Sequence, residues 1–192
     1  MKNKNAISCI LAAFILMCVI GTPGMAQDAV PVPDTSATIP IKDLPIASVK
    51  ATGDRKTGNL TVSIEFENKW SNTVDVSLSV GGWDNFGFTS DKGAKYKVHT
   101  YYNKMTDENP NSGYKQVTTI KFGEKEMTMA TVLPQSFSAG ENKIFVVKVT
   151  NFEKLGKSIS QLHLVCSHYY QYGGGINSSG EYKLKNIPIV WY

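Results

Sequence analysis

Two histidines and a cysteine lie close together in the last part of the sequence. His163, Cys166 and His168 form the pattern His-x-x-Cys-x-His, and imidazole nitrogen and thiolate sulfur are the ligands that zinc prefers. The surrounding residues alternate between apolar and polar, so we expect a strand that turns residue 163 away from residues 166 and 168. Three ligands then do not converge, and we predict neither a metal site nor a cofactor. We expect Cys166 to be a small buried residue.

Glu65 and Glu67 form a carboxylate pair, the arrangement with which glycoside hydrolases cleave their substrates. Both lie on the polar side of one alternating run, where glutamates are usually solvated. The sequence contains no Gly-x-Ser-x-Gly, no His-Glu-x-x-His and no phosphate-binding glycine loop. We therefore predict that the protein is not an enzyme, and a hydrolase that uses these two glutamates is the least favoured alternative.

Aromatic residues outside the alternating pattern are the stronger candidates for binding. Sugars stack on exposed rings while carboxylate and amide groups bind their hydroxyls, and tyrosine and tryptophan are also common anchors at protein interfaces. The alternative is that these rings cap the ends of the hydrophobic core. The candidate ligand-binding residues are Trp83, Asp84, Tyr101, Tyr169, Tyr170 and Tyr172.

The segments that must position these side chains have the pattern of short β-strands. Apolar and polar residues alternate in runs separated by polar or glycine-containing turns, which is typical of half-buried strands. No stretch shows a convincing helical period. Strands are expected from residue 46 onward, and the clearest runs are 60–66, 74–80, 95–103, 114–122, 127–133, 144–149, 162–166 and 181–191.

Two details of this pattern predict how strands are placed. Only a short connection, residues 68–72, separates the runs 60–66 and 74–80, so we expect these two strands to lie close together and antiparallel. Proline cannot donate to a strand ladder, so Pro188 predicts that the last strand lies at a sheet edge.

About nine short strands, spaced by about 8–15 residues, predict an all-β fold, specifically an immunoglobulin-like sandwich of two antiparallel sheets. A small outer-membrane β-barrel is the alternative. Two observations favour the sandwich. Several runs are shorter than the about 9–11 residues of a membrane-crossing strand, and Asn186 and Pro188 would share a face of the last strand with Val190 and Tyr192.

The N-terminal residues have the three parts of a secretory signal peptide. Lys2 and Lys4 precede an uncharged apolar run, and Gly24-Met25-Ala26 resembles a signal peptidase site. Residues 1–26 are therefore predicted to be removed on export, with an uncleaved membrane anchor as the alternative. Lipidation at Cys18 is disfavoured, because the bulky Met17 stands where a lipobox has a small residue.

The remaining chain divides into two parts. Four prolines in residues 27–45 predict a flexible tether, with an arm packed along the domain as the alternative. Residues 46–192 are predicted to form one β-sandwich domain. We expect the protein to be exported, whether periplasmic, on the cell surface or secreted, with no transmembrane segment after signal cleavage.

The charge pattern argues against nucleic acid as a partner. The formal net charge of the whole sequence is +4, and Arg55 is the only arginine. Proteins that bind nucleic acid use arginine and clustered positive charge, whereas the lysines here are interspersed with acidic residues. We therefore predict no nucleic-acid partner.

Several short segments occur in an order that resembles a family of exported bacterial immunoglobulin-like domains of unknown function, often found on lipoproteins. They are Phe66-Glu67-Asn68, the run from Val74 to Leu78, Asp91-Lys92-Gly93-Ala94-Lys95-Tyr96, the segment from Gly140 to Val149, and Ile187-Pro188-Ile189. The resemblance covers about residues 46–190 and rests on structural motifs that many sandwiches share. It implies the fold and a location in the cell envelope, and it assigns no catalytic residues.

These observations together predict a non-catalytic exported envelope protein that acts as a protein-interaction or structural domain. A carbohydrate-binding module that uses exposed tryptophan and tyrosine side chains is the first alternative, and the outer-membrane barrel is the second. The expected partner is accordingly an envelope protein or a glycan of unknown identity.

Overall fold

The computed structural model describes residues 39–80, 86–98, 114–128, 130, 132–153, 156–169 and 176–192. Every regular element within these ranges is a β-strand, which confirms the predicted all-β class. None of these residues belongs to a helix of the length and apolar character that crossing a bilayer requires. The strands are β1 (Ile46–Asp54), β2 (Asn59–Glu67), β3 (Val74–Ser79), β4 (Phe86–Ser90), β5 (Lys95–Val98), β6 (Tyr114–Val117), β7 (Thr119–Phe122), β8 (Lys125–Met127), β9 (Val132–Phe137), β10 (Asn142–Val149), β11 (Ser158–Tyr169) and β12 (Ile176–Trp191).

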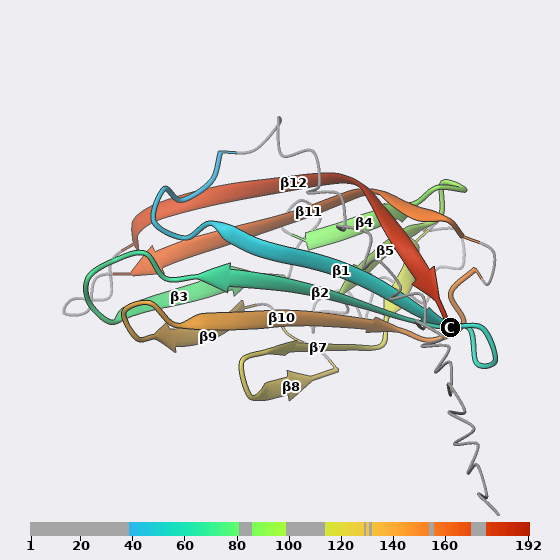
Figure 1. Ribbon diagram of the computed structural model, residues 1–192, viewed down its shortest axis with the longest axis horizontal. Helices are drawn as coiled ribbons and strands as arrows, with labels where there is room; N and C mark the ends of the chain where they lie inside the picture. Colours follow the sequence, from blue (N-terminus) through green and yellow to red (C-terminus); the bar gives the residue numbers. More distant parts are fainter. Residues whose placement is uncertain are drawn as a thin grey trace, which may run out of the picture.

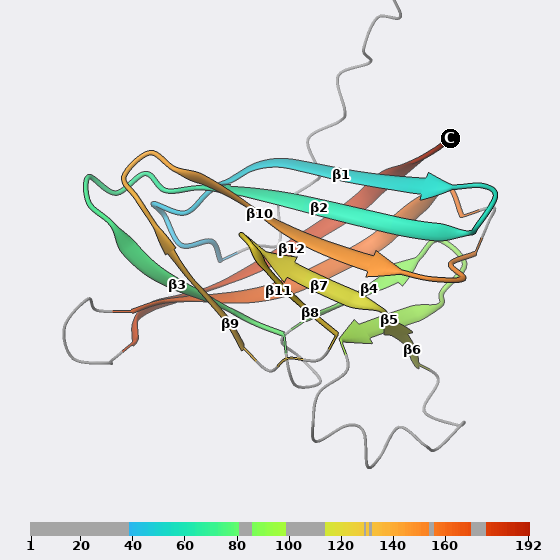
Figure 2. The same cartoon turned by 90° about the horizontal axis from the view of Figure 1, so that it is seen from below.

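The strands form one mixed sheet that curls strongly (Figures 1 and 2). Its order is β6-β5-β4-β11-β12-β1-β2-β10-β7-β8, and β3 pairs with both β11 and β9. Two neighbouring pairs are parallel, β1 with β12 and β5 with β6. The curl places β1, β2 and β10 across from β3, β4 and β11 (Figure 2). The fold is therefore a single curled, mixed sheet, whereas two separate antiparallel sheets were expected.

Aromatic side chains fill the space that the curl encloses. Phe66 of β2 meets Tyr182 of β12 edge to face, with ring centroids 5.5 Å apart. Phe86 of β4 meets Phe145 of β10 in the same way at 5.4 Å. This geometry brings the positive edge of one ring to the negative face of the other. Because Phe86 and Phe145 lie on opposite sides of the curl, the two sides share one core.

The last strand lies inside the sheet, so the prediction of an edge position from Pro188 was wrong. β12 pairs with β11 as far as Pro188 and then with β1 from Ile189 onward. Asn186, just before this change of partner, has a φ of 55°. Pro188 has no N–H group, so the exchange of strand partner at this residue leaves no backbone donor unpaired. The next amide, that of Ile189, donates to the carbonyl of Lys157 at 2.9 Å.

The strands β2 and β3 do not pair, although a short connection joins them. β2 lies between β1 and β10, whereas β3 lies between β11 and β9. The connection therefore crosses from one side of the curl to the other. Loop length alone does not distinguish such a crossing from a hairpin, which is why the expected antiparallel pair was wrong.

Three further strand assignments differ from the sequence pattern. The predicted run 114–122 is two strands, β6 and β7, and the predicted run 127–133 is also two, β8 and β9; the members of each pair lie at separate places in the sheet. β4 was not predicted, although Phe86 and Phe88 are buried on either side of Gly87 with the period of a strand. Gly87 interrupts the pattern, because glycine is depleted in strands.

The described part of the proline-containing segment, residues 39–45, packs against the domain. Ile41 and Leu44 are buried in the core. Tyr182 donates its hydroxyl to the carbonyl of Leu44 at 2.7 Å and accepts from the amide of Ile41 at 3.3 Å. Ile39 pairs with Glu181 of β12 through its backbone. The packed part of the chain thus begins before Ile46, and residues 1–38 lie outside the described ranges.

Candidate functional site

Most of the predicted ligand-binding residues lie outside the described part of the chain. This applies to Trp83, Asp84, Tyr101, Tyr170 and Tyr172. The remaining candidate, Tyr169, is the last residue of β11 and is half-buried. Its strand neighbours are Asp75 of β3 and Ile176 of β12. The end of the molecule where β11 finishes and β3 begins is therefore the place to look for a binding surface.

A tryptophan that the sequence analysis did not select lies at this end. Trp70, in the connection between β2 and β3, stacks on His168 with ring centroids 4.5 Å apart and planes tilted by 38°. The Trp70 ring is only partly buried against the core. The sequence did contain a signal for this residue. Trp70 is a large aromatic residue in a short polar connection between two strands, where small or polar residues would be enough to join them.

Asn68 holds this connection in place. Its side-chain nitrogen donates to the carbonyls of Asn72, Phe137 and Ser138 at 3.1, 3.1 and 2.8 Å. Its side-chain oxygen accepts from the backbone amide of Trp70 at 2.8 Å. Asn68 is buried, so these bonds are shielded from water. The indole is thus carried by a fixed backbone.

Burial favours the neutral form of the imidazole beneath Trp70. His168 is 8% exposed, and burial lowers its pKa below the usual value of 6.5, while the charge of Asp75 acts in the opposite direction. The side-chain nitrogen of Asn177 lies 3.3 Å from Nδ1 of His168. An amide nitrogen only donates, so Nδ1 accepts here. We call Trp70, Asp75, His168, Tyr169 and Asn177 the aromatic end.

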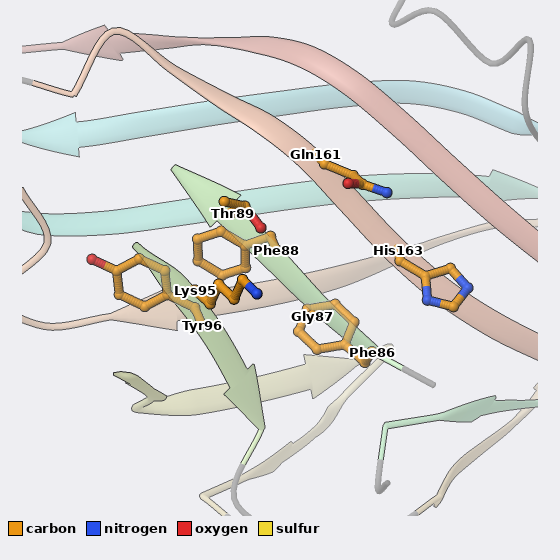
Figure 3. Close-up of a pocket in the computed structure, with 8 residues that line it drawn as sticks. All are labelled: Phe86, Gly87, Phe88, Thr89, Lys95, Tyr96, Gln161 and His163. Carbon is orange, nitrogen blue, oxygen red and sulfur yellow. The ribbon is translucent and has the colours of Figure 1, made fainter. Parts of the chain in front are cut away.

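A second feature is a shallow depression on the outer face of β4, β5 and β11 (Figure 3). It has a volume of about 140 Å³ and lies over Gly87, which has no side chain to fill it. A Cβ atom at this glycine would come within 3.1 Å of the carbonyl oxygen of Tyr96. The polar side chains around the depression are Thr89, Lys95, Gln161 and His163.

A charged cluster borders the depression on the β12 side. One carboxylate oxygen of Glu181 lies 2.7 Å from Nε2 of His163 and 3.0 Å from Nζ of Lys183. The hydrogen bond from Lys183 is the main cause that lowers the pKa of Glu181. The contact with His163 also lowers the pKa of Glu181, but less than the hydrogen bond from Lys183 does.

The structure separates the three residues of the His-x-x-Cys-x-His pattern. Cys166 is fully buried, as predicted, and burial raises the pKa of its thiol. His163 lies on the outer face of β11 beside Glu181, and His168 lies beneath Trp70. No group of three or more potential ligands from histidine, cysteine, aspartate and glutamate gathers among the described residues.

The surroundings of Glu65 do not favour the protonated carboxyl group that acid catalysis requires. Glu65 accepts hydrogen bonds from Ser48 at 2.8 Å and from Asn142 at 3.0 Å, and the bond from Ser48 is the main cause that lowers its pKa. Glu67 pairs with Lys69 at 3.2 Å. A glycosidase needs one carboxyl group whose pKa is raised so that it can protonate the leaving group. The surroundings of Glu65 act in the other direction.

Comparison with known proteins adds no family to this description. No protein-family model matches the sequence, and no curated protein is significantly similar to it. The functional argument therefore rests on the residues of this chain.

Proposed function

We propose that the protein is a non-catalytic binding domain of the bacterial cell envelope that holds a partner protein at its aromatic end. The observation that carries the proposal is the stack of Trp70 on His168, with the Trp70 backbone held by Asn68. Tryptophan and tyrosine dominate the binding energy of many interfaces, and side chains that are already held lose little entropy on binding. Tyr169 supplies a second partly exposed ring at the same end.

The proposed location and lineage follow from the sequence. The positively charged, apolar and small-residue parts of residues 1–26 support export. The order of strand motifs from Phe66 to Ile189 supports descent from the exported immunoglobulin-like domains. In this proposal the curled sheet is a variant of their sandwich, in which β12 bridges the two sides.

The test compares two tyrosines at opposite ends of the molecule. Tyr169→Ala removes a ring from the aromatic end, and Tyr192→Ala removes a ring that is 76% exposed at the C-terminus, which Figure 1 places at the other end. The wild-type protein and Tyr192→Ala should retain the same envelope protein from a membrane extract. Tyr169→Ala should bind that partner about tenfold more weakly. Equal retention by both variants would contradict the proposal.

Carbohydrate binding at the same end is the second candidate. Trp70 and Tyr169 offer rings for a sugar to stack on, while Asp75 and Asn177 offer a carboxylate and an amide for its hydroxyls. A glycan that shifts the tryptophan fluorescence of the wild type, but not that of Trp70→Phe, would favour this candidate. If the fluorescence does not respond to any glycan of an array, protein binding is favoured.

A further inference from the structure

The aromatic end places a ring and a carboxylate side by side on the outer face of the sheet. Tyr169 of β11 lies directly opposite Asp75 of β3 in an antiparallel pair, so their side chains share a face. Val76, the next residue of β3, is buried in the core, so Asp75 points outward, where it is exposed. Side chains that are directly opposite have Cβ atoms about 5 Å apart, so one group of a ligand can contact both.

No ion pair joins Asp75 to a cation of the part of the chain that the structure describes. The lysines of the two neighbouring connections are each engaged by another acid. Lys69 lies 3.2 Å from a carboxylate oxygen of Glu67, and Lys143 lies 2.8 Å from one of Glu141. The charge of Asp75 is therefore available to a partner.

The other neighbours of this carboxylate do not neutralise it. His168 is the group whose pKa the charge of Asp75 raises, but burial has the larger, opposite effect. Its pKa therefore stays below 6.5, and the imidazole carries little charge at pH 7.5. Residues 170–175, which join β11 to β12, contain no charged residue. The outer face at this end thus presents one negative charge beside an aromatic ring.

We propose that Tyr169 and Asp75 bind an arginine side chain of the partner protein, an inference that rests on the proposed function and specifies its chemistry. The guanidinium group lies flat on the Tyr169 ring, whose face attracts cations. Two of its N–H groups donate to the carboxylate of Asp75. The exposed hydroxyl of Ser136, the strand neighbour of Asp75 on the other side, accepts a third hydrogen bond.

The arrangement favours arginine over other cations. Strand pairing gives the row Ile176-Tyr169-Asp75-Ser136, in which the ring and the carboxylate belong to neighbouring strands. A planar guanidinium with five donors can stack on the ring and bond to the carboxylate at once, whereas an ammonium group is a compact, strongly hydrated point charge. A calcium or magnesium ion needs several oxygen ligands, and Asp75 is the one acid of this row.

A titration followed by nuclear magnetic resonance tests the inference with three small probes at pH 7.5. They are the acetylated amides of arginine, of lysine and of citrulline, which has the shape of arginine without its charge. The arginine probe should shift the backbone amide signals of Asp75, Ser136 and Tyr169. It should bind at least about threefold more tightly than the lysine probe, and the citrulline probe should not bind.

Variants at the two residues separate charge from ring. Asp75→Asn should weaken binding of the arginine probe about fivefold, because it removes the charge and keeps the shape. The matched control, Glu124→Gln, removes an exposed acid from the turn between β7 and β8 and should stay within about twofold of the wild type. Tyr169→Leu should weaken binding about threefold, whereas Tyr169→Phe keeps the ring and should bind like the wild type. Unchanged melting temperatures exclude loss of fold as the cause.

Three results of the titration would overturn the inference. The arginine probe fails to shift these signals, the citrulline probe binds as tightly as the arginine probe, or Asp75→Asn and Glu124→Gln weaken binding equally. The envelope partner supplies the last comparison, because Asp75→Asn should also bind it about fivefold more weakly.

The proposed function and the inference can fail separately. Undiminished binding of the envelope partner by Asp75→Asn, combined with its loss in Tyr169→Ala, would overturn the inference and leave the proposed function intact. Conversely, equal retention of the partner by Tyr169→Ala and Tyr192→Ala would overturn the proposed function, while specific binding of the arginine probe would still confirm the arginine site.

Discussion

At the scale of single residues, the contact between Trp70 and His168 links the electrostatics of the domain to its proposed binding surface. The imidazole is buried beneath the indole, and this burial lowers its pKa. A neutral ring can stack there without the cost of burying a charge. The protonation state of His168 therefore affects both the stability of the domain and the surroundings of the Trp70 ring.

The lowered pKa of His168 predicts a loss of stability in mild acid. The unfolded chain takes up a proton near the ordinary pKa of 6.5, whereas the folded protein takes it up only at a lower pH. The free energy of unfolding should therefore fall as the pH drops below about 6.5, and His168→Gln should reduce this fall. Urea titrations at a series of pH values measure it.

Nuclear magnetic resonance checks the cause of this pH dependence. The folded protein should show a pKa for His168 below 6.5, and Asp75→Asn should lower it further, because the charge of Asp75 favours the protonated form. A measured value at or above 6.5 would contradict the account. The carboxyl groups whose pKa values are lowered, such as Glu65, act in a separate window below 4.5, so they do not obscure the result.

Residue-scale predictions from the sequence were partly successful. The alternation of the strand correctly separated His163 from Cys166 and correctly buried the cysteine. The stack of Trp70 on His168 could not be predicted, because alternation places a residue on a face but does not say which distant loop covers that face. Tyr169 is the one proposed ligand-binding residue that the described structure places.

At the scale of elements, β12 is the strand on which the architecture depends. It pairs with β11 over most of its length and with β1 at its end. The backbone needs a local change of direction to serve two partners, and the positive φ of Asn186 lies just before the exchange. Asparagine tolerates this left-handed conformation better than most residues do.

Substitution at residue 186 tests this role. Asn186→Val should lower the free energy of unfolding by about 1–2 kcal/mol, because a β-branched residue is strained at a φ of 55°. Asn186→Gly should change it by no more than about 0.5 kcal/mol, because glycine adopts this conformation freely. The side chain is exposed, so neither change disturbs the core. Equal effects of the two substitutions in urea unfolding would show that backbone conformation is not the cause.

Strands were predicted correctly where the alternation was strong. They were missed or misplaced where a residue type is compatible with more than one structure. Apolar and polar residues alternate strictly in β2, and in β10 the buried residues Phe145, Val147 and Val149 recur with the same period. β4 was not predicted because it contains Gly87, and glycine indicates a loop more often than a strand unless the paired strands are known. Pro188 suggested an edge, because the sequence does not reveal that the strand changes partner at that residue.

At the scale of the whole molecule, the two sides of the curled sheet depend on one aromatic core. Phe145 of β10 contacts Phe86 of β4 on the other side and Phe122 of β7 on its own side. Neither side can bury its apolar face without the other, because a sheet needs a second layer against which to pack. We therefore expect one cooperative folding unit.

Phe145→Ala should destabilise the entire domain. The ring is fully buried, and its removal leaves a cavity between the two sides, so the expected cost is about 3–5 kcal/mol. Ile144→Ala on the neighbouring, 45% exposed residue is the control and should cost less than about 1 kcal/mol. Circular dichroism and tryptophan fluorescence should give coincident transitions for both variants. Transitions that separate would mean that the two sides unfold independently.

The pairing order of the whole sheet was beyond sequence reasoning. Strand patterns indicate which residues face the core. They do not determine which strand lies next to which, because apolar faces are largely interchangeable among strands of similar length. The depression over Gly87 depends on the register of β4 with β5 and β11, which the strand pattern does not determine.

The parallel pairing of β1 with the end of β12 has a consequence for the timing of folding. β1 cannot complete its pairing until residues 189–191 are present, because Ala51 pairs with Ile189 and Gly53 pairs with Trp191. Contacts so distant in sequence close slowly, because the chain must lose the entropy of a long loop before it gains the contact. A polypeptide that lacks residues 189–191 cannot complete this sheet. If the chain is exported as proposed, the delay keeps it unfolded while an export machinery that threads extended polypeptide engages its N-terminus.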